Sequence, residues 1–312
     1  MLKADGNRKF YRGWNAGITR VFCSAGLTSR LHFQLTCLSV INALLSVTAV
    51  LGNTIILFAL NRESSLHSPS KLLFRCLATA DLCAGLIAEP LTVAFWISFL
   101  HGRREICRYT LMSLGAGYTL ISVSLCTLTA ISVDRLLALV LGLRYRQVVT
   151  MKRTYAVVAV FWVGATAGTT TFFWDYRVTF WGGYMTISLF LLMSTASYSK
   201  IFLILRRRKT HVQDRNKRGP CQGTTVNLMR YRKAVYNALW LQLMLVVCYL
   251  PYGIVVAFSA NRVMSSPLFL ARQCTVTLVF LNSTLNPILY FWKIGEVRRA
   301  VKNTISQFLC FN

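Results

Sequence analysis

The sequence predicts an all-α membrane protein, a seven-transmembrane helix bundle with a short amphipathic helix after the last span. The chain has 312 residues, of which 55% are hydrophobic and only 14% are charged, a composition typical of membrane proteins. Its apolar residues form blocks of about 18 or more, and a helix of that length crosses the roughly 30 Å hydrocarbon layer. Backbone polar groups find no water there, so only helices or a closed barrel can span it, and these blocks are too long for barrel strands.

The apolar blocks divide the chain into three regions. Residues 1–34 are expected to form a disordered extracellular tail, 35–292 the transmembrane domain, and 293–312 a membrane-surface helix with a short cytoplasmic tail. The seven predicted spans are 35–60, 72–99, 109–140, 154–174, 181–205, 234–259 and 266–292.

The distribution of basic residues orients the bundle. Lys and Arg near span ends stay on the cytoplasmic side, and the loops on the side of 206–233, with the carboxy-terminal tail and the adjoining span ends, hold 23 of the 35 basic residues. The amino terminus is therefore predicted outside, in a multi-pass protein of the plasma membrane. Most of the net charge of +26 then faces anionic membrane lipids and a cytoplasmic partner, and nucleic acid is not expected as a partner. The basic composition of residues 1–34 leaves a mitochondrial transit peptide as an alternative.

Ionisable side chains inside spans are the strongest functional signal in such a sequence, since each costs at least about 2.5 kcal/mol at mid-bilayer without a partner. Asp81 lies near the middle of the second span and Glu89 in its outer part, while Asp134 and Arg135 lie near the inner end of the third. A solvated salt bridge alone is the alternative for Asp134 and Arg135. The first two carboxylates leave open a transporter or channel with Asp81 and Glu89 in the permeation path.

Prolines inside spans and the residues after the last span give two further predictions. Pro90, Pro251 and Pro287 each lack a backbone donor and are expected to bend their helices, which makes these sites candidate hinges. In residues 293–310 apolar side chains recur at helical spacing with basic residues on other faces, as in a helix lying on the membrane surface. Cys310 at its end is a candidate for lipidation, an unmodified thiol being the alternative.

Six short motifs, one in each of six spans, occur in order along the chain. They are GN at 52–53, LATAD at 77–81, DRL at 134–136, Trp162, CYLP at 248–251 and NPILY at 286–290. Together they resemble the rhodopsin-like (class A) G-protein-coupled receptors over nearly the whole chain. LHSP at 66–69, with no cysteine in the second outer loop and no span-five proline, is most similar to the group of melanocortin, cannabinoid and lysophospholipid receptors.

The resemblance implies an internal pocket that binds sodium in the resting state. Hard cations prefer oxygen ligands, and a carboxylate supplies the charge that a buried Na⁺ requires. The alternative is a polar core with water and no ion, and no other cofactor is expected. The matching residues are Asp81, Ser124, Asn282, Ser283 and Asn286, with Asn53 nearby.

The resemblance also implies a switch that couples to a heterotrimeric G protein. Arg135 would be restrained by Asp134 at rest and freed on activation, with Tyr198 and Tyr290 supporting the open state. Pro251 and Pro287 would be hinges, beside Tyr249, which stands where the family usually has tryptophan. No acidic residue near Tyr231 can restrain Arg135 from the sixth span, so appreciable basal activity is predicted.

By the same resemblance, a ligand pocket is expected in the outer half of the bundle. Gly117 replaces the aspartate of amine receptors, and 266–292 lacks the lysine of opsins, so both ligand types are disfavoured. Glu89 is the acidic residue placed to meet a ligand cation, and a pair with Arg272 is its alternative role. A small molecule, a lipid and a peptide remain open as ligand classes. The predicted pocket residues are Glu89, Ser113, Gly117, Tyr118, Ile121, Tyr252 and Phe280.

Three expectations concern features outside these sites. At most one outer disulfide is expected, between Cys23 and Cys107. Arrestin binding is expected to be weak, because the short tail offers only Thr304 and Ser306 as phosphorylation sites, unless the third inner loop substitutes for them. No enzymatic activity is expected, since the four histidines lie near or outside the membrane surfaces and no catalytic set occurs inside.

Overall fold

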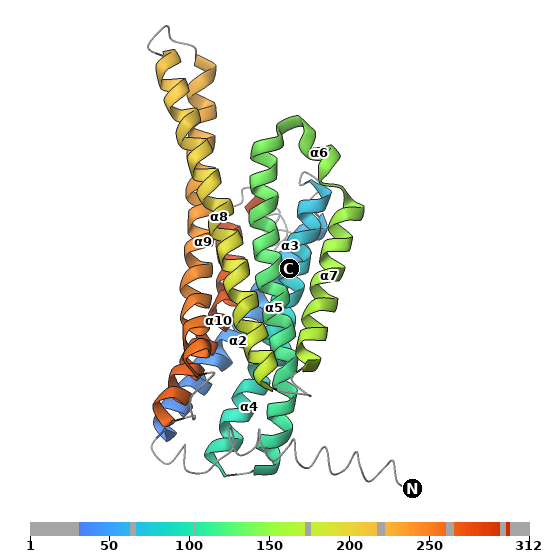
Figure 1. The fold of residues 1–312 in the computed structure, drawn as a ribbon, viewed down its shortest axis with the longest axis vertical. Coiled ribbons are helices and arrows are strands. Elements are labelled where there is room, and N and C mark those ends of the chain that lie inside the picture. The colour runs from blue at the N-terminus through green and yellow to red at the C-terminus, as the bar shows by residue number, and fades with distance from the viewer. Residues whose placement is uncertain are drawn as a thin grey trace, which may run out of the picture.

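The computed structural model describes residues 31–62, 67–102, 104–171, 176–216, 222–259, 265–293 and 298–299. These residues are almost entirely helical and contain no strand (Figure 1). The long elements are α2 (His32–Arg62), α3 (Ser68–Cys83), α4 (Glu89–Leu100), α5 (Arg104–Leu141), α7 (Met151–Thr170), α8 (Tyr176–Asn216), α9 (Gln222–Ser259) and α10 (Ser266–Lys293). The π turn η2 (Ala84–Ala88) joins α3 to α4, and η3 (Gly142–Arg144) with α6 (Tyr145–Val148) follows α5.

Each of the seven predicted spans corresponds to one helical unit, which confirms the all-α bundle. Six units are long and apolar enough to cross a membrane: His32–Asn61, Ser68–Ser98, Gly115–Val148, Trp181–Ile204, Gln242–Ser259 and Ser266–Leu289. The seventh, α7, begins with Met151, Lys152 and Arg153, so its described part is less apolar. The chain is thus a multi-pass membrane protein.

Packing places α5 at the centre of the bundle, where it contacts α3, α4, α7 and α8, while α10 packs between α2 and α9. The main core lies between these helices and contains Leu77, Leu125 and Tyr249 among its buried residues. Large apolar side chains also cover the outer face, including Leu44 and Leu192, which are more than 60% exposed. Lipid is as apolar as a protein core, so an exterior of this kind suits a membrane helix.

The irregularity expected at Pro90 takes the form of the π turn η2, which ends just before it. Pro90 has no N–H to return to the preceding turn. The Ser46 hydroxyl of α2 donates instead to the Gly85 carbonyl at 2.7 Å. Gly85 is also packed tightly, since a Cβ there would lie 3.1 Å from Ala49. A neighbouring helix therefore satisfies the backbone, as hydrocarbon requires.

The prolines of spans six and seven lie inside continuous helices, Pro251 in α9 and Pro287 in α10. At Pro287 the bundle is tight, because a Cβ on Gly52 would lie 3.0 Å from the proline ring. The glycine of the GN motif thus allows α2 to approach α10. At one end of the bundle α8 and α9 project together well past the other helices (Figure 1).

Several predicted features lie outside the described residues. These are the tail 1–30 with Cys23, the surface helix with Cys310, and the side chains of Cys107, Ser113 and Tyr290. Their predictions stay untested.

Candidate functional site

Three helices bring hydroxyl and amide donors onto the carboxylate of Asp81, which is fully buried in α3. Ser124 of α5 and Ser283 of α10 each donate to Oδ1 at 2.9 Å. Asn286 of α10 donates from Nδ2 to Oδ2 at 2.7 Å. Four of the six residues predicted for the internal pocket therefore form one hydrogen-bonded cluster, in which a buried charge is stabilised by three donors.

Asn53 and Asn282, the other two predicted members, lie in the same interior region. Asn53 donates to the Ser283 carbonyl at 3.1 Å, which links α2 to the cluster. Its Oδ1 is buried and has no hydrogen-bond partner among the described residues, and the same holds for Nδ2 of Asn282. The carboxylate, the two hydroxyls and the free amide oxygen of Asn53 are the oxygen donors that a hard cation such as Na⁺ prefers. The residues present therefore fit that ion.

Tyr249 of α9, the predicted hinge aromatic, is only 1% exposed and packs in the main core. The charge of Asp81 acts on its hydroxyl, and Ser124 is its polar neighbour. The side chain of Tyr249 in α9 thus lies beside the Asp81 cluster, and the two interact electrostatically.

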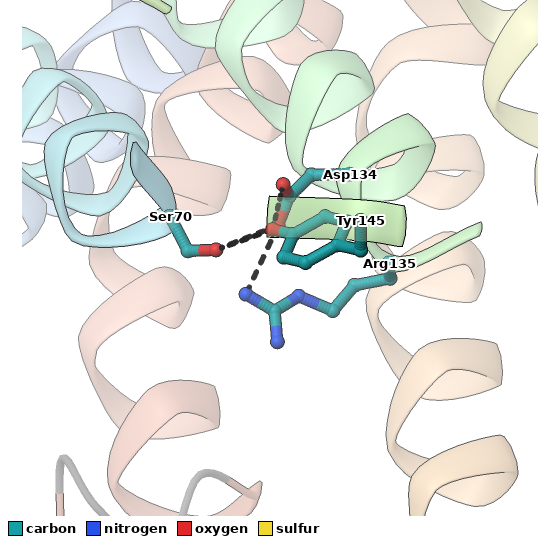
Figure 2. A network of polar contacts seen from close by, with 4 residues as sticks. All are labelled: Ser70, Asp134, Arg135 and Tyr145. Atoms are coloured by element: carbon teal, nitrogen blue, oxygen red, sulfur yellow. Dashed lines mark hydrogen bonds and ion pairs between the residues drawn. The ribbon is translucent and has the colours of Figure 1, made fainter. Parts of the chain in front are cut away.

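A second polar network surrounds Asp134 at the inner end of α5 (Figure 2). Arg135 pairs with Asp134 at 3.1 Å between Nη2 and Oδ2. Ser70 of α3 donates to Oδ2 at 2.9 Å, and the Tyr145 hydroxyl of α6 donates to Oδ1 at 2.5 Å. The Arg135 guanidinium also lies 5.8 Å from the centre of the Phe74 ring. Asp134 is 4% exposed and Arg135 is 43% exposed, so the arginine reaches the surface of the molecule while the aspartate is buried.

Sequence reasoning missed Ser70 and Tyr145, because neither has a signal of its own. Both are ordinary polar residues near predicted span ends, and only the packing of α3 and α6 against α5 brings them to Asp134. Tyr198, predicted to support the open state, is buried in α8 and packs against Leu136 and Leu139.

A cavity of about 110 Å³ lies in the half of the bundle away from Arg135, between α4, α5, α8, α9 and α10. Its walls include five of the predicted pocket residues: Gly117, Tyr118, Ile121, Tyr252 and Phe280. The walls also include Arg272 and Gln273 of α10, of which the sequence analysis considered only Arg272, and only as a partner of Glu89.

The polar residues of this cavity take part in two sets of hydrogen bonds. Tyr118 accepts hydrogen bonds from the Tyr252 hydroxyl and from Nη2 of Arg272, both at 2.9 Å. Oε1 of Gln273 accepts a hydrogen bond from the Trp96 indole at 3.0 Å. The lining residues in these contacts come from α5, α9 and α10, and the other residues that line the cavity are mostly apolar.

Glu89 does not line this cavity, contrary to the expectation from its position before Pro90. Its side chain is fully buried, and neither carboxylate oxygen has a hydrogen-bond partner among the described residues, Arg272 included. The physical reason is the π turn, which adds a residue to the turn before Glu89 and so changes the face on which the side chain lies. Full burial of both Asp81 and Glu89 also gives no support to a water-filled permeation path.

Comparison with known proteins gives one consistent class. A family profile described as 7 transmembrane receptor (rhodopsin family) matches residues 52–180. Melanocortin receptor 5 of Ovis aries is 26% identical over 277 residues, which cover 84% of this chain and 82% of the relative. Adenosine receptor A2a of Canis lupus familiaris is 25% identical over 298 residues, which cover 84% of this chain and 70% of the relative. Adenosine receptor A2b of Homo sapiens is 25% identical over 309 residues, which cover 85% of this chain and 88% of the relative.

These relatives are receptors, which decides between the two classes that the buried carboxylates left open. Melanocortin and adenosine receptors match at the same level of identity, so the comparisons single out no subgroup. The motif order, the seven helices and the matches agree: the chain is similar to the rhodopsin-like (class A) G-protein-coupled receptors.

Proposed function

We propose that this chain is a plasma-membrane receptor, with its amino terminus outside, that binds an extracellular ligand in the outer cavity and activates a heterotrimeric G protein at its inner end. One observation carries the proposal: a single helix, α5, lines the cavity with Tyr118 and carries Arg135 at its other end. Seventeen residues separate the two positions, about 25 Å along a helix. A shift of α5 or its neighbours therefore links the two ends.

The proposed step is an outward movement of the inner part of α9 about Pro251. Tyr249, two residues before the proline, lies beside the Asp81 cluster, so the arrangement of that cluster biases the position of α9. Opening would release Arg135 from the network of Asp134 to contact the G protein. Ligand and G protein then each favour the open state, and each must raise the affinity of the other by the same factor.

Sodium is proposed as a negative modulator of this step. Asp81, Ser124, Ser283 and Asn53 would hold the ion, and its charge would tie α2, α3, α5 and α10 together in the closed arrangement. An ion that binds only the closed state stabilises that state, so it shifts the equilibrium between the closed and open states toward the closed one.

The test is nucleotide exchange on a mixture of heterotrimeric G proteins, with membranes that carry the chain, across a sodium titration and without ligand. We expect exchange above background that falls as sodium rises. Arg135→Ala is expected to abolish the exchange, and Asp81→Asn to leave the exchange but remove its dependence on sodium.

Potassium at equal ionic strength is the control for screening of surface charges. Exchange that falls equally with both salts would contradict the sodium site, and exchange that survives Arg135→Ala would contradict the coupling role. Absence of exchange in every condition, with the chain shown at the cell surface, would contradict the basal activity.

A further inference from the structure

Glu89 of α4 and Asn42 of α2 carry three buried oxygen atoms that accept no hydrogen bond. Both side chains are fully buried. The atoms are Oε1 and Oε2 of Glu89 and Oδ1 of Asn42, and none has a hydrogen-bond partner among the described residues. A buried acceptor without a donor is destabilising, and more so when it carries a charge. These atoms therefore require a bound group that donates to them or carries positive charge.

The two residues lie at the same level of neighbouring helices. α2 packs against both η2 and α4, and the Ser46 hydroxyl donates across this interface to the Gly85 carbonyl at 2.7 Å. Consecutive spans cross the bundle in opposite directions. Asn42, four residues before Ser46, and Glu89, four residues after Gly85, are thus each about one turn further from Arg135.

The hydrogen bonds of Asn42 fix which of its amide atoms is left over. Its Nδ2 donates to the Leu38 carbonyl at 2.9 Å and to Oγ1 of Thr277 in α10 at 2.8 Å. Thr277 uses its own hydroxyl proton on the Gln273 carbonyl at 3.1 Å, so toward Asn42 it can only accept. Both N–H groups of Asn42 are therefore in use, and its Oδ1 can only accept. Asn42 cannot donate to an ionised carboxylate.

No other donor in the described part of the chain reaches Glu89. The hydroxyl of Thr92, one turn later in α4, donates to the Ala88 carbonyl at 2.8 Å. The charged group that acts on Glu89 is Asp81, which is also a carboxylate and therefore opposes a second negative charge. The other ionisable side chains on the surrounding helices at this level, none of them bonded to Glu89, are Cys37, Cys83, Tyr118, Arg272 and Cys274.

A proton suits this site better than a metal ion. A hard cation such as Na⁺ or Ca²⁺ requires several oxygen ligands, and the described residues contain no group of three or more acidic, histidine or cysteine side chains that could hold a metal ion. A proton on Glu89 removes the charge from a site without a counter-ion. It also converts one carboxyl oxygen into a donor, for which Oδ1 of Asn42 is the acceptor that remains.

We propose that Glu89 is a proton-binding site, occupied in this arrangement of the helices, in which the neutral carboxylic acid donates its O–H to Oδ1 of Asn42. The bond joins α4 to α2 and, through Thr277, to α10. Asp81, which has three donors, keeps its charge, so the two carboxyl groups of one span take opposite forms. α4 also lines the cavity, so loss of the proton loosens one of its walls. The site does not depend on coupling to a G protein.

Infrared spectroscopy of the full chain tests the protonation directly. The chain is purified in dodecyl maltoside, which has no carbonyl group of its own, at neutral pH. We expect the carbonyl stretch of a protonated carboxylic acid, a band that shifts in heavy water and that Glu89→Gln removes. Asp81→Asn is the matched control and should leave the band in place. Asn42→Val should move the band, because the O–H of Glu89 then loses its acceptor.

The melting temperature against pH gives a second readout. Glutamine donates an N–H to Asn42 as the acid donates its O–H, but it has no proton to lose. Rising pH ionises Glu89 in the unfolded chain before it does so in the folded chain, which favours unfolding of the unaltered protein alone. We expect Glu89→Gln to become the more stable form as pH rises, by at least about 2–4 °C between about pH 5 and pH 8.

Absence of a band that Glu89→Gln removes would overturn the proposal, as would a band that only Asp81→Asn removes. Stabilisation by sodium that is lost in Glu89→Gln, without a band, would assign the site to a metal cation instead. If Glu89→Gln does not fold, isotope labelling of the glutamate carboxyl groups in the unaltered chain decides, because the band then shifts only if it belongs to a glutamate.

Discussion

Single polar residues inside the bundle show what sequence can and cannot reveal about a site. Asp81 and Asp134 were predicted because a carboxylate inside a span is expensive, and both are buried and hydrogen-bonded. Glu89 followed the same rule but lies away from the cavity, because the π turn before it changes its face. Ser70 and Tyr145 had no signal at all, since polar residues near span ends are ordinary.

Tyr145 provides a prediction at this scale. Tyr145→Phe removes the 2.5 Å hydrogen bond to Asp134, worth about 1.5–3 kcal/mol when one partner is charged. Asp134 then restrains Arg135 less firmly, so we expect basal nucleotide exchange to rise severalfold. Tyr155→Phe, on the exposed face of α7, is the matched control and should change nothing. Equal exchange in the two variants would show that Tyr145 does not restrain the switch.

At the scale of elements, α8 and α9 are joined by a polar clasp that no motif marks. Gln242 of α9 accepts a hydrogen bond from Ser194 at 2.5 Å and donates to Thr195 at 2.8 Å, and Ser194 lies 3.2 Å from Ser132 of α5. The clasp lies on the amino-terminal side of Pro251 in α9 and holds the part of α9 that is proposed to move. It supplies a restraint in a chain whose sixth span has no acidic partner for Arg135.

Breaking the clasp should favour the open state. Gln242→Leu removes both hydrogen bonds between the helices, and we expect basal exchange to increase and its sodium sensitivity to decrease, because a smaller part of the population remains closed. Thr166→Val is the control, since Thr166 bonds only to the Trp162 carbonyl of its own helix on an exposed face. A clasp variant with unaltered exchange would place the restraint elsewhere.

For the whole molecule, the stability of the bundle depends on close approach between helices more than on burial. Its outer face is apolar and meets lipid, so removal of apolar surface from water cannot drive the helices together. Close van der Waals contact holds the helices together instead, as at Gly52, where α2 lies against the Pro287 ring of α10. The same approach holds Asn53 beside Ser283, so packing and the Asp81 cluster share one interface.

Gly52→Ala tests this dependence. The added Cβ would lie 3.0 Å from two atoms of Pro287, which cannot move as a flexible side chain would. We expect a loss of about 1–3 kcal/mol in stability, measured as a lower melting temperature in detergent. Gly164→Ala meets nothing within 4 Å and should be neutral or slightly stabilising, since alanine favours a helix. A neutral Gly52→Ala would mean that the two helices can separate without cost.

The sequence by itself determined the class, the number of helices and most of the internal polar pocket. The helices follow from local physics, because apolar length matches the bilayer and a charge inside it demands partners. The class and the pocket follow from motifs that resemble those of a known receptor family. Only the tertiary structure decided the network of Ser70 and Tyr145, the clasp of Gln242, the burial of Glu89 and the place of Arg272 in the cavity wall. These depend on the rotation and approach of whole helices, which one π turn or one glycine can change without altering any motif.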